Sequence, residues 1–388
     1  QWLKEHGADV NAGGNNGMTA LMLACKSGSL ECTQWLAEHG ADVNARKTYG
    51  GIALMWACDS GSLECTQWLT EHGEHVNARN YNDKTALMWA CKSGSLECTQ
   101  WLTEHGAHVN ARDYNDRTAL MWTCKSGSLE CTKWLAEHGA DFNARSNDGV
   151  TALMWACDSG PLECTQWLTE HGADVNAGDI FGTTALMWAC DSGSLECTQW
   201  LTEHGADVNA RDKYGRTALM FACKSGSLEC THWLTEHGAH VNARDNDDET
   251  ALMLACKSGS LECTKWLTEH GADVNASDND GRTALMLACD SGSLECTQWL
   301  TEHGADVNAR GNDDKTALML ACKSGSLECT KWLTEHGADV NASDNDGGTA
   351  SMLAYRSGSL ECTQWLIEHG ADVNARRNDD EIFIDVGL

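Results

Sequence analysis

Cysteine and histidine are the residues of this sequence with the widest chemistry. The chain has 21 Cys and 16 His among 388 residues, and both types bind zinc, while thiols also form disulfides. The cysteine count is odd and no Cys-x-x-Cys pair of the zinc type occurs. Ten cysteines, such as Cys25, end a recurring Ala-Leu-Met-x-x-Cys segment, and eleven, such as Cys32, follow a recurring Leu-Glu pair. We expect them to pack as small hydrophobes, with zinc binding or redox storage as the alternative.

The histidines do not form a catalytic pattern. Twelve of them stand in Glu-His-Gly, where a cation near a helix C-terminus is mildly favourable. His75, His108 and His240 replace an Asp that neighbouring segments keep, so we expect no ligand role for them. No Ser-His-Asp order, phosphate loop or carboxylate pair stands out. The sequence therefore predicts no enzyme, no catalytic residue, no cofactor and no metal site.

These residues recur because the whole sequence repeats with a step of 33 residues. Thr-Ala-Leu-Met begins at Thr19 and returns in register, with the variants Ile52-Ala-Leu-Met and Thr349-Ala-Ser-Met. The other copies begin at Thr85, Thr118, Thr151, Thr184, Thr217, Thr250, Thr283 and Thr316. A fixed period of this length is typical of stacked repeats, in which each unit buries its apolar face only against its neighbours.

Each repeat reads as two short helices and a link, as the unit from Thr283 to Lys315 illustrates. Thr283 is a candidate N-cap for a first helix that runs to about Ser291, and Ser293 is a candidate N-cap for a second one. Gly304 suits the left-handed position that ends this second helix. The following Ala-Asp-Val-Asn-Ala segment and its Asn-Asp-rich tip predict a hairpin-like link.

This pattern resembles the ankyrin repeat. The family motif runs Gly-x-Thr-Pro-Leu-His-x-Ala-Ala, then Gly-His-Leu-Glu, then Gly-Ala-Asp-Val-Asn-Ala; here Thr-Ala-Leu-Met-x-Ala-Cys, Gly-Ser-Leu-Glu-Cys and Gly-Ala-Asp-Val-Asn-Ala take those places. The resemblance implies an all-α solenoid of helix-turn-helix pairs joined by β-hairpin-like loops, in a curved, elongated rod. Ala in place of Pro, and Met and Ser in place of two His, should weaken each repeat locally.

The repeat boundaries predict one array without internal linkers. Residues 1–18 match a partial N-terminal repeat, residues 19–381 eleven full repeats, and residues 382–388 a partial C-terminal cap. We expect Ile382 to Val386 to cover the last apolar face and Trp2 and Leu3 to be exposed at the other end. Because the first residue is Gln1, we interpret the sequence as a fragment.

Charge and hydropathy restrict the class of partner. The formal net charge is -30, from 57 acidic and 27 basic residues spread over the repeats, so nucleic acid is not an expected partner. The same excess can steer a basic protein or peptide toward the surface. No stretch approaches the roughly 18 apolar residues of a membrane span. We expect a monomer in the cytoplasm, with the nucleus as an alternative, because so many thiols favour a reducing compartment.

Positions that differ between repeats point to a binding region. Two of them are aromatic in the first half of the array, namely the tip of the link and the residue after Met in the first helix. Leu occupies the second position elsewhere, as in Leu23, Leu254, Leu287, Leu320 and Leu353. Since Tyr and Trp are favoured interface anchors, we predict protein binding here, with plain core variation as the alternative. The predicted residues are Tyr49, Trp56, Tyr81, Trp89, Tyr114, Trp122, Trp155, Phe181, Trp188, Tyr214 and Phe221.

The resemblance implies a function as well as a fold. Ankyrin repeats hold partners on the concave side, with the tips and first helices, so we expect a scaffold or adaptor that binds a protein or peptide. The alternative is that the array is the targeting arm of a larger enzyme, such as a kinase or a ubiquitin-ligase assembly, whose catalytic part lies outside this sequence.

Overall fold

The computed structural model describes residues 7, 9–15, 17–46 and 49–377. They divide into two compact units, residues 1–185 and 186–388, and each unit is considered by itself. Most of the predicted N-terminal partial repeat, including Trp2 and Leu3, and the predicted cap from Ile382 to Val386 lie outside the described residues.

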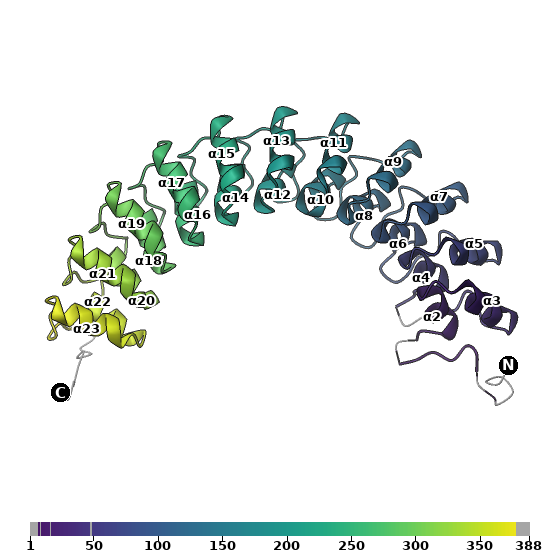
Figure 1. Cartoon of the computed structure of the whole chain (residues 1–388), viewed down its shortest axis with the longest axis horizontal. Coiled ribbons are helices and arrows are strands. Elements are labelled where there is room, and N and C mark those ends of the chain that lie inside the picture. Colours follow the sequence, from purple (N-terminus) through teal and green to yellow (C-terminus); the bar gives the residue numbers. More distant parts are fainter. Residues whose placement is uncertain (1–6, 8, 16, 47–48, 378–388) are drawn as a thin grey trace. The chain divides into compact units, whose positions relative to one another are not determined.

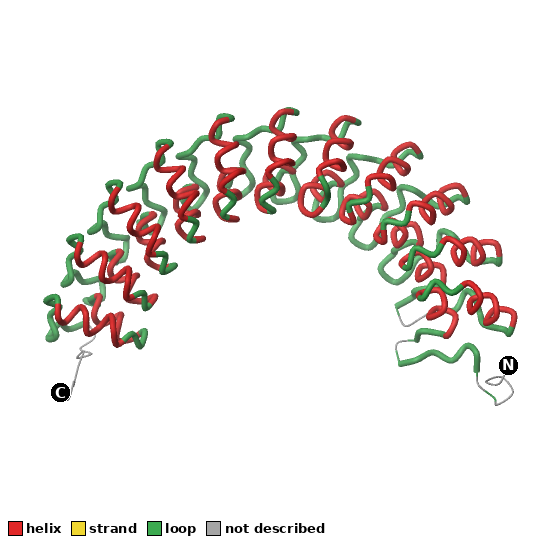
Figure 2. Tube along the Cα trace, in the orientation of Figure 1, coloured by secondary structure: helices red, strands yellow, loops and turns green. Residues whose placement is uncertain are grey.

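The described residues form 22 α-helices in pairs of a short and a longer helix (Figures 1 and 2). Apart from isolated β-bridges, the described part of the chain has no strand, so the all-α prediction is confirmed. The first unit contains α2 (Ala20–Lys26), α3 (Leu30–Glu38), α4 (Ala53–Asp59), α5 (Leu63–Glu71), α6 (Ala86–Ser93), α7 (Leu96–Glu104), α8 (Ala119–Ser126), α9 (Leu129–Glu137), α10 (Ala152–Ser159) and α11 (Leu162–Glu170). From α12 (Ala185–Asp191) the second unit continues with α13 (Leu195–Glu203), α14 (Ala218–Ser225), α15 (Leu228–Glu236), α16 (Ala251–Ser258), α17 (Leu261–Glu269), α18 (Ala284–Asp290), α19 (Leu294–Glu302), α20 (Ala317–Ser324), α21 (Leu327–Glu335), α22 (Ala350–Arg356) and α23 (Leu360–Glu368).

The helix boundaries follow the predicted caps. The Thr283 hydroxyl accepts a hydrogen bond from the Met286 amide at 3.4 Å, which satisfies a donor at the start of α18. Gly304 takes a left-handed φ of 92° after the C-cap of α19, as expected. Ser293 stands at the N-cap of α19, but its side chain accepts no capping hydrogen bond, so the predicted hydroxyl cap is wrong in this repeat. At the equivalent Ser62 the hydroxyl does accept from the Cys65 amide, at 3.3 Å.

The core is a stack in which each helix pair covers the next. Leu and Met of the first helices are almost fully buried, as at Leu252 and Met253, and so is Leu267 of the second helix. A buried Thr in each second helix was not anticipated: the Thr264 hydroxyl donates to the Ser260 carbonyl oxygen at 2.8 Å. The Thr264 hydroxyl oxygen lies 3.7 Å from the sulfur of Cys256 and 3.6 Å from the sulfur of Cys296 in the next repeat. The cysteines are therefore packing partners of a satisfied hydroxyl.

The links are joined from one repeat to the next through their asparagines. The Asn242 side-chain amide donates to the carbonyl oxygen of Gly271 at 2.9 Å, and its oxygen accepts from the Asp273 amide at 2.8 Å. Within a link, isolated antiparallel bridges such as Ser277 to Thr283 give the hairpin-like form that was predicted. Because these bonds recur at the same positions, the tips are held in register along each unit.

The second full repeat caps its first helix in a different way from its neighbours. Ile52 replaces the capping Thr, and α4 has no side-chain cap from its own N-terminal residue. Glu74, which stands where other repeats have Ala, is 4% exposed and accepts a hydrogen bond from the Leu54 amide through Oε2 at 2.9 Å. Burial raises the pKa of Glu74 to about 8, against the opposing effect of the Leu54 and Ala53 amides. The carboxyl group thus replaces the missing hydroxyl as the cap.

Candidate protein-binding surface

The aromatic residues predicted at the link tips are exposed. Their exposed fractions lie between 45% for Phe181 and 71% for Tyr114, with Tyr49, Tyr81 and Tyr214 in between. Backbone hydrogen bonds fix the tips to one another, since the Tyr81 amide donates to the Tyr49 carbonyl oxygen at 3.1 Å. The tips therefore present aromatic rings to solvent from a constrained backbone, which limits the entropy lost on binding.

The aromatic residues predicted in the first helices are more enclosed. Trp56, Trp89, Trp155 and Trp188 are half-buried. Trp122 is 9% exposed and Phe221 7%, comparable with Leu254 at the same position. At these last two positions the aromatic ring mainly fills the core, so each offers a partner little surface. We call the face formed by Tyr49, Trp56, Tyr81, Trp89, Tyr114, Trp122 and Trp155, all in the first unit, the aromatic surface.

A pocket of about 210 Å³ opens in the aromatic surface between the second and third full repeats. Its lining includes Tyr49, Gly51, Met55, Trp56 and Trp89. The next repeats carry Lys84 and Arg117 at the position of Gly51, and their side chains cover the tryptophans. The pocket therefore opens where Gly51 has no side chain to lay over the neighbouring tryptophans.

Cations cover the tryptophans beyond the pocket. The Lys84 ammonium lies 4.0 Å from the ring centre of Trp122 and 5.3 Å from that of Trp89. Lys125 lies 4.1 Å from the ring centre of Trp155, within the range of cation–π attraction. The sequence did not reveal this alternation of rings and cations, because the residues come from different repeats.

Arg117 shows how this surface differs from its counterparts. Its guanidinium carbon lies 5.7 Å from the ring centre of Trp122 and 5.6 Å from that of Trp155. In the second unit the equivalent Arg282 instead donates from Nε to Oδ2 of Asp278 at 2.9 Å. The matching atom of the first unit, Oδ2 of Asp113, is buried with no hydrogen-bond partner. Arg117 thus covers tryptophans where Arg282 pairs with a carboxylate.

A family comparison identifies the repeats. The family model described as ankyrin repeats (3 copies) matches residues 1–47, 46–113, 113–179, 176–245, 243–311 and 309–377 in succession. The chain belongs to the ankyrin repeat family. A search of curated proteins found no relative that matches it. Ankyrin repeats are generally protein–protein interaction modules, and proteins built from them are typically non-catalytic scaffolds.

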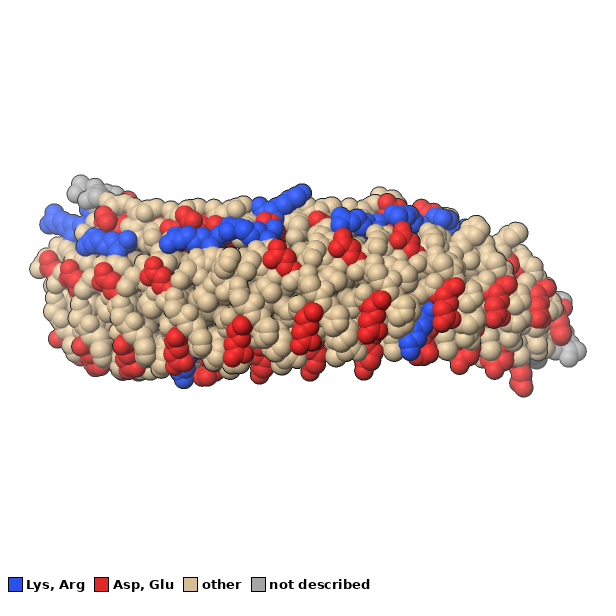
Figure 3. All heavy atoms as spheres, turned by 90° about the horizontal axis from the view of Figure 1, so that it is seen from above, with Lys and Arg blue, Asp and Glu red and all other residues tan. Residues whose placement is uncertain are grey.

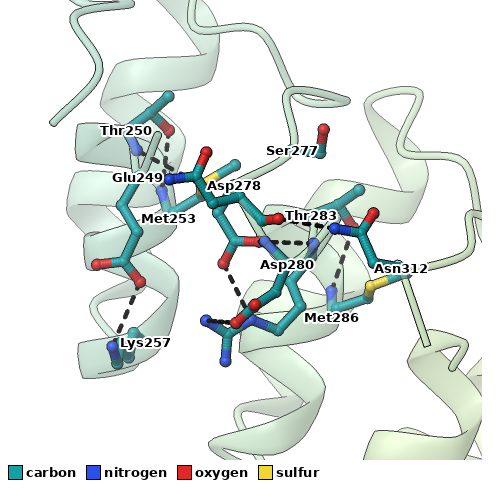
Figure 4. Close-up of polar contacts among 12 residues, drawn as sticks. Glu249, Thr250, Met253, Lys257, Ser277, Asp278, Asp280, Thr283, Met286 and Asn312 are labelled. Carbon is teal, nitrogen blue, oxygen red and sulfur yellow. Dashed lines mark hydrogen bonds and ion pairs between the residues drawn. The ribbon is translucent and has the colours of Figure 1, made fainter. Parts of the chain in front are cut away.

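The ankyrin repeats of the second unit carry a different surface at the same positions. A cavity of about 280 Å³ is lined by Leu287 and Leu320 and by charged groups that are paired with one another. Lys315 lies 2.5 Å from Asp313 and Lys323 3.2 Å from Asp290. Figure 4 shows this region, where Lys257 points to Glu249 and where the carboxyl groups of Asp278 and Asp280 both pair with Arg282. Ion pairs there neutralise the cations.

Ion pairs between ankyrin repeats also explain the alternation of Lys and Asp at the ends of the first helices. Lys92 lies 3.4 Å from Asp59, and Lys224 lies 3.9 Å from Asp191. Acidic side chains are spread over the face seen in Figure 3, whereas Lys and Arg gather along one edge of it. The acidic excess is thus distributed over the repeats, as the sequence indicates.

The thiols of the ankyrin repeats are packed away from solvent. Cys32 is exposed and the other 20 cysteines are buried, all 21 of them among the described residues. Burial raises the pKa of Cys25 and of Cys124 to about 12, which disfavours the reactive thiolate. Within the described ranges, no three His, Cys, Asp or Glu side chains converge as metal ligands would.

The histidines of Glu-His-Gly have a structural place. Nδ1 of His303 donates to the Trp299 carbonyl oxygen at 2.7 Å, and the imidazole stacks on the Trp299 ring with ring centres 3.7 Å apart. The indole Nε1 of Trp299 donates to the Thr268 hydroxyl of the preceding repeat at 2.7 Å. The Trp and His side chains on this side of the second helices therefore bond to neighbouring groups of the protein.

No helix among the described residues has the length and apolarity needed to cross a bilayer.

Proposed function

We propose that the aromatic surface of the first unit holds a partner protein or peptide. The observation that carries this proposal is the row of three exposed tyrosines, Tyr49, Tyr81 and Tyr114, beside the pocket at Trp56 and Trp89. Tyrosine supplies a large amphipathic contact with few rotatable bonds, and an apolar pocket accepts an anchoring side chain. Membership of the ankyrin repeat family supports the same role.

The three tyrosines differ from scattered exposed apolar residues because they are adjacent. Each stands at the tip of one of three successive links, and inter-repeat hydrogen bonds such as Tyr114 amide to Asn82 carbonyl oxygen, at 2.9 Å, fix the spacing. Burying one such ring contributes about 1.5 to 3 kcal/mol. Two or three rings together with a side chain in the pocket contribute about 5 to 12 kcal/mol, which is of the same order as the cost of association.

The test is partner capture with the full chain as bait. Tyr81→Ala and Tyr114→Ala, alone and combined, should reduce recovery of the partners that the wild type captures. Tyr355→Ala is the matched control, because Tyr355 is 61% exposed but lies on α22 in the second unit. Trp122→Ala is unsuitable, since removal of a 9% exposed ring would leave a cavity. Equal capture by the wild type and the combined tip variant would overturn the proposal.

The proposal extends to the organisation and setting of the chain. We propose one continuous array, because the 33-residue step passes through Thr151, Thr184 and Thr217 without a linker. A monomer in the cytoplasm or nucleus is consistent with 20 buried cysteines that are not in disulfides. Cooperative loss of helical signal in denaturant, without a separate transition for each unit, is the expected result for a continuous array.

A further inference from the structure

Lys92, which lies over Trp89, pairs with Asp59, but four other cations of the aromatic surface have no such partner. Lys84, Arg117, Lys125 and Lys26 form no ion pair in the part of the chain that the structure describes. Each lies over tryptophan instead, with Lys26 5.2 Å from the ring centre of Trp56. In a chain with a net charge of -30, four cations on one face without a carboxylate partner are unusual. The second unit pairs its equivalent groups with aspartates.

Lys84 is one of the more enclosed of these cations. It is half-buried between Trp89 and Trp122, and desolvation lowers its pKa, although the charge of Asp113 acts in the opposite direction. A carboxylate that approached this ammonium would restore the electrostatic stabilisation lost with water. A second cation would meet repulsion from Lys84 and Arg117 at short range.

We propose that the aromatic surface binds an extended acidic segment of its partner, with an apolar side chain in the pocket and carboxylates on Lys84 and Arg117. This inference rests on the protein-binding function proposed above. The proposed partner segment is acidic, whereas the net negative charge of the chain by itself favours a basic partner. The local cations decide the contact, because charges a few ångströms away outweigh those screened beyond about 10 Å.

Repeat spacing specifies the pattern of the segment. Neighbouring helix pairs pack about 8 to 10 Å apart, and an extended chain advances about 3.3 Å per residue, so one repeat corresponds to about three residues. The pocket lies between Trp56 and Trp89 of the second and third full repeats. Lys84 lies one step further, over Trp89 and Trp122, and Arg117 two steps further, over Trp122 and Trp155. The segment should therefore carry an apolar anchor followed by acidic residues about three and six positions away.

A single-stranded nucleic acid is the competing occupant, because rings alternating with cations also suit stacked bases. The observations favour the peptide. Trp122 is 9% exposed and Trp89 half-buried, with cations already on their faces, so little ring area is open for stacking. A polyanion with a charge on every nucleotide would also meet the acidic residues of an array with a net charge of -30.

The test is selection from a random displayed-peptide library on the full chain, followed by anisotropy titration of the selected peptides. Enrichment of Asp and Glu about three and six residues from an apolar residue is expected. Lys84→Gln and Arg117→Gln should each weaken the selected peptides about three- to tenfold, and replacement of their acidic residues by Gln or Asn should do the same. Lys323→Gln is the control, since Lys323 already pairs with Asp290. Circular dichroism should confirm that each variant is folded.

Several outcomes would overturn the inference. Enrichment of basic or unbiased peptides, or no binder at all, contradicts an acidic segment. So does an oligothymidine that binds more tightly than the selected peptides and loses affinity in the same two variants. If selected peptides depend on Tyr81 and Tyr114 but not on Lys84 and Arg117, the protein-binding function stands and only the acidic chemistry fails. If neither set of variants matters, both proposals fail.

Discussion

Glu74→Gln should remove a pH dependence of folding that a buried carboxyl group imposes on the second full repeat. In the folded chain Glu74 is 4% exposed, its Oε2 caps α4 through the Leu54 amide, and its Oε1 is buried without a hydrogen-bond partner. Burial raises the pKa from 4.5 to about 8, and the charge of Asp42 adds to the effect. The folded state therefore holds a proton that the unfolded state releases above pH 4.5.

The sign and size follow from this difference. Below pH 4.5 both states are protonated and the wild type has its full stability from this group. As pH rises from 4.5 to 8 the unfolded state alone loses the proton, so the free energy of unfolding falls. A pKa shift of about 3.5 at about 1.4 kcal/mol per pH unit gives a maximum loss of about 5 kcal/mol. Above pH 8 both states are ionised and the loss levels off.

The assay compares the wild type with Glu74→Gln, which keeps the capping oxygen and cannot ionise. Guanidinium denaturation at pH 5, 7 and 9, with hydrogen exchange of α4 as a local readout, should show the wild type losing stability relative to the variant as pH rises. Burial, the largest cause of the raised thiol pKa values of Cys25 and Cys58, is common to both proteins and cancels in the difference, whereas the smaller effect of the Glu74 charge is absent from the variant. A wild-type minus variant difference that is the same at pH 5 and pH 9 would refute the reasoning.

A second pair of variants tests the capping role apart from the charge. Glu74→Ala restores the residue of most other repeats but leaves α4 without a side-chain cap, because Ile52 has no hydroxyl. Ile52→Thr should therefore raise the free energy of unfolding by about 1 kcal/mol more in the Glu74→Ala background than in the wild type. Additive effects would show that the Glu74 carboxyl does not serve as the cap.

Three further predictions concern packing and strain. With a thiol reagent, only Cys32 should react rapidly in the native chain and all 21 cysteines in denaturant, and Cys32→Ser should abolish the fast phase; several fast thiols would contradict the buried packing. Asp248→Gly should stabilise the chain by about 1 kcal/mol in denaturant titrations, because Asp248 has a left-handed φ of 58° that glycine adopts without strain. Asp83, Asp116 and Asp314 share this conformation but form ion pairs, whereas Asp248 forms none in the described ranges. Ala136→Thr should raise the free energy of unfolding by about 0.5 to 1 kcal/mol, because the new hydroxyl can accept a hydrogen bond from the Trp167 indole, as Thr103 does from Trp134. Ala136→Val is the control and should not give this gain, since it has no hydroxyl.

The sequence predicted the parts of the fold that depend on neighbours within one repeat. Thr caps, Gly at left-handed positions and the apolar pattern of each helix act over three or four residues, so the 33-residue unit identifies its helices and its family. The exposed tips also followed from sequence, because Tyr81 and Tyr114 lie in turn segments that core packing does not enclose.

Tertiary structure alone decided what the tips and first helices present together. Stacking places Lys84 over Trp122 across 38 positions of the chain and opens a pocket beside Gly51, where the following repeats have Lys84 and Arg117. It also brings Glu74 to the start of α4, 20 residues earlier in the chain. Such contacts depend on how one repeat packs on the next and on which side chains fill the space between them. The sequence determined the ankyrin scaffold of this protein, and the packing between repeats determined the chemistry of its surface.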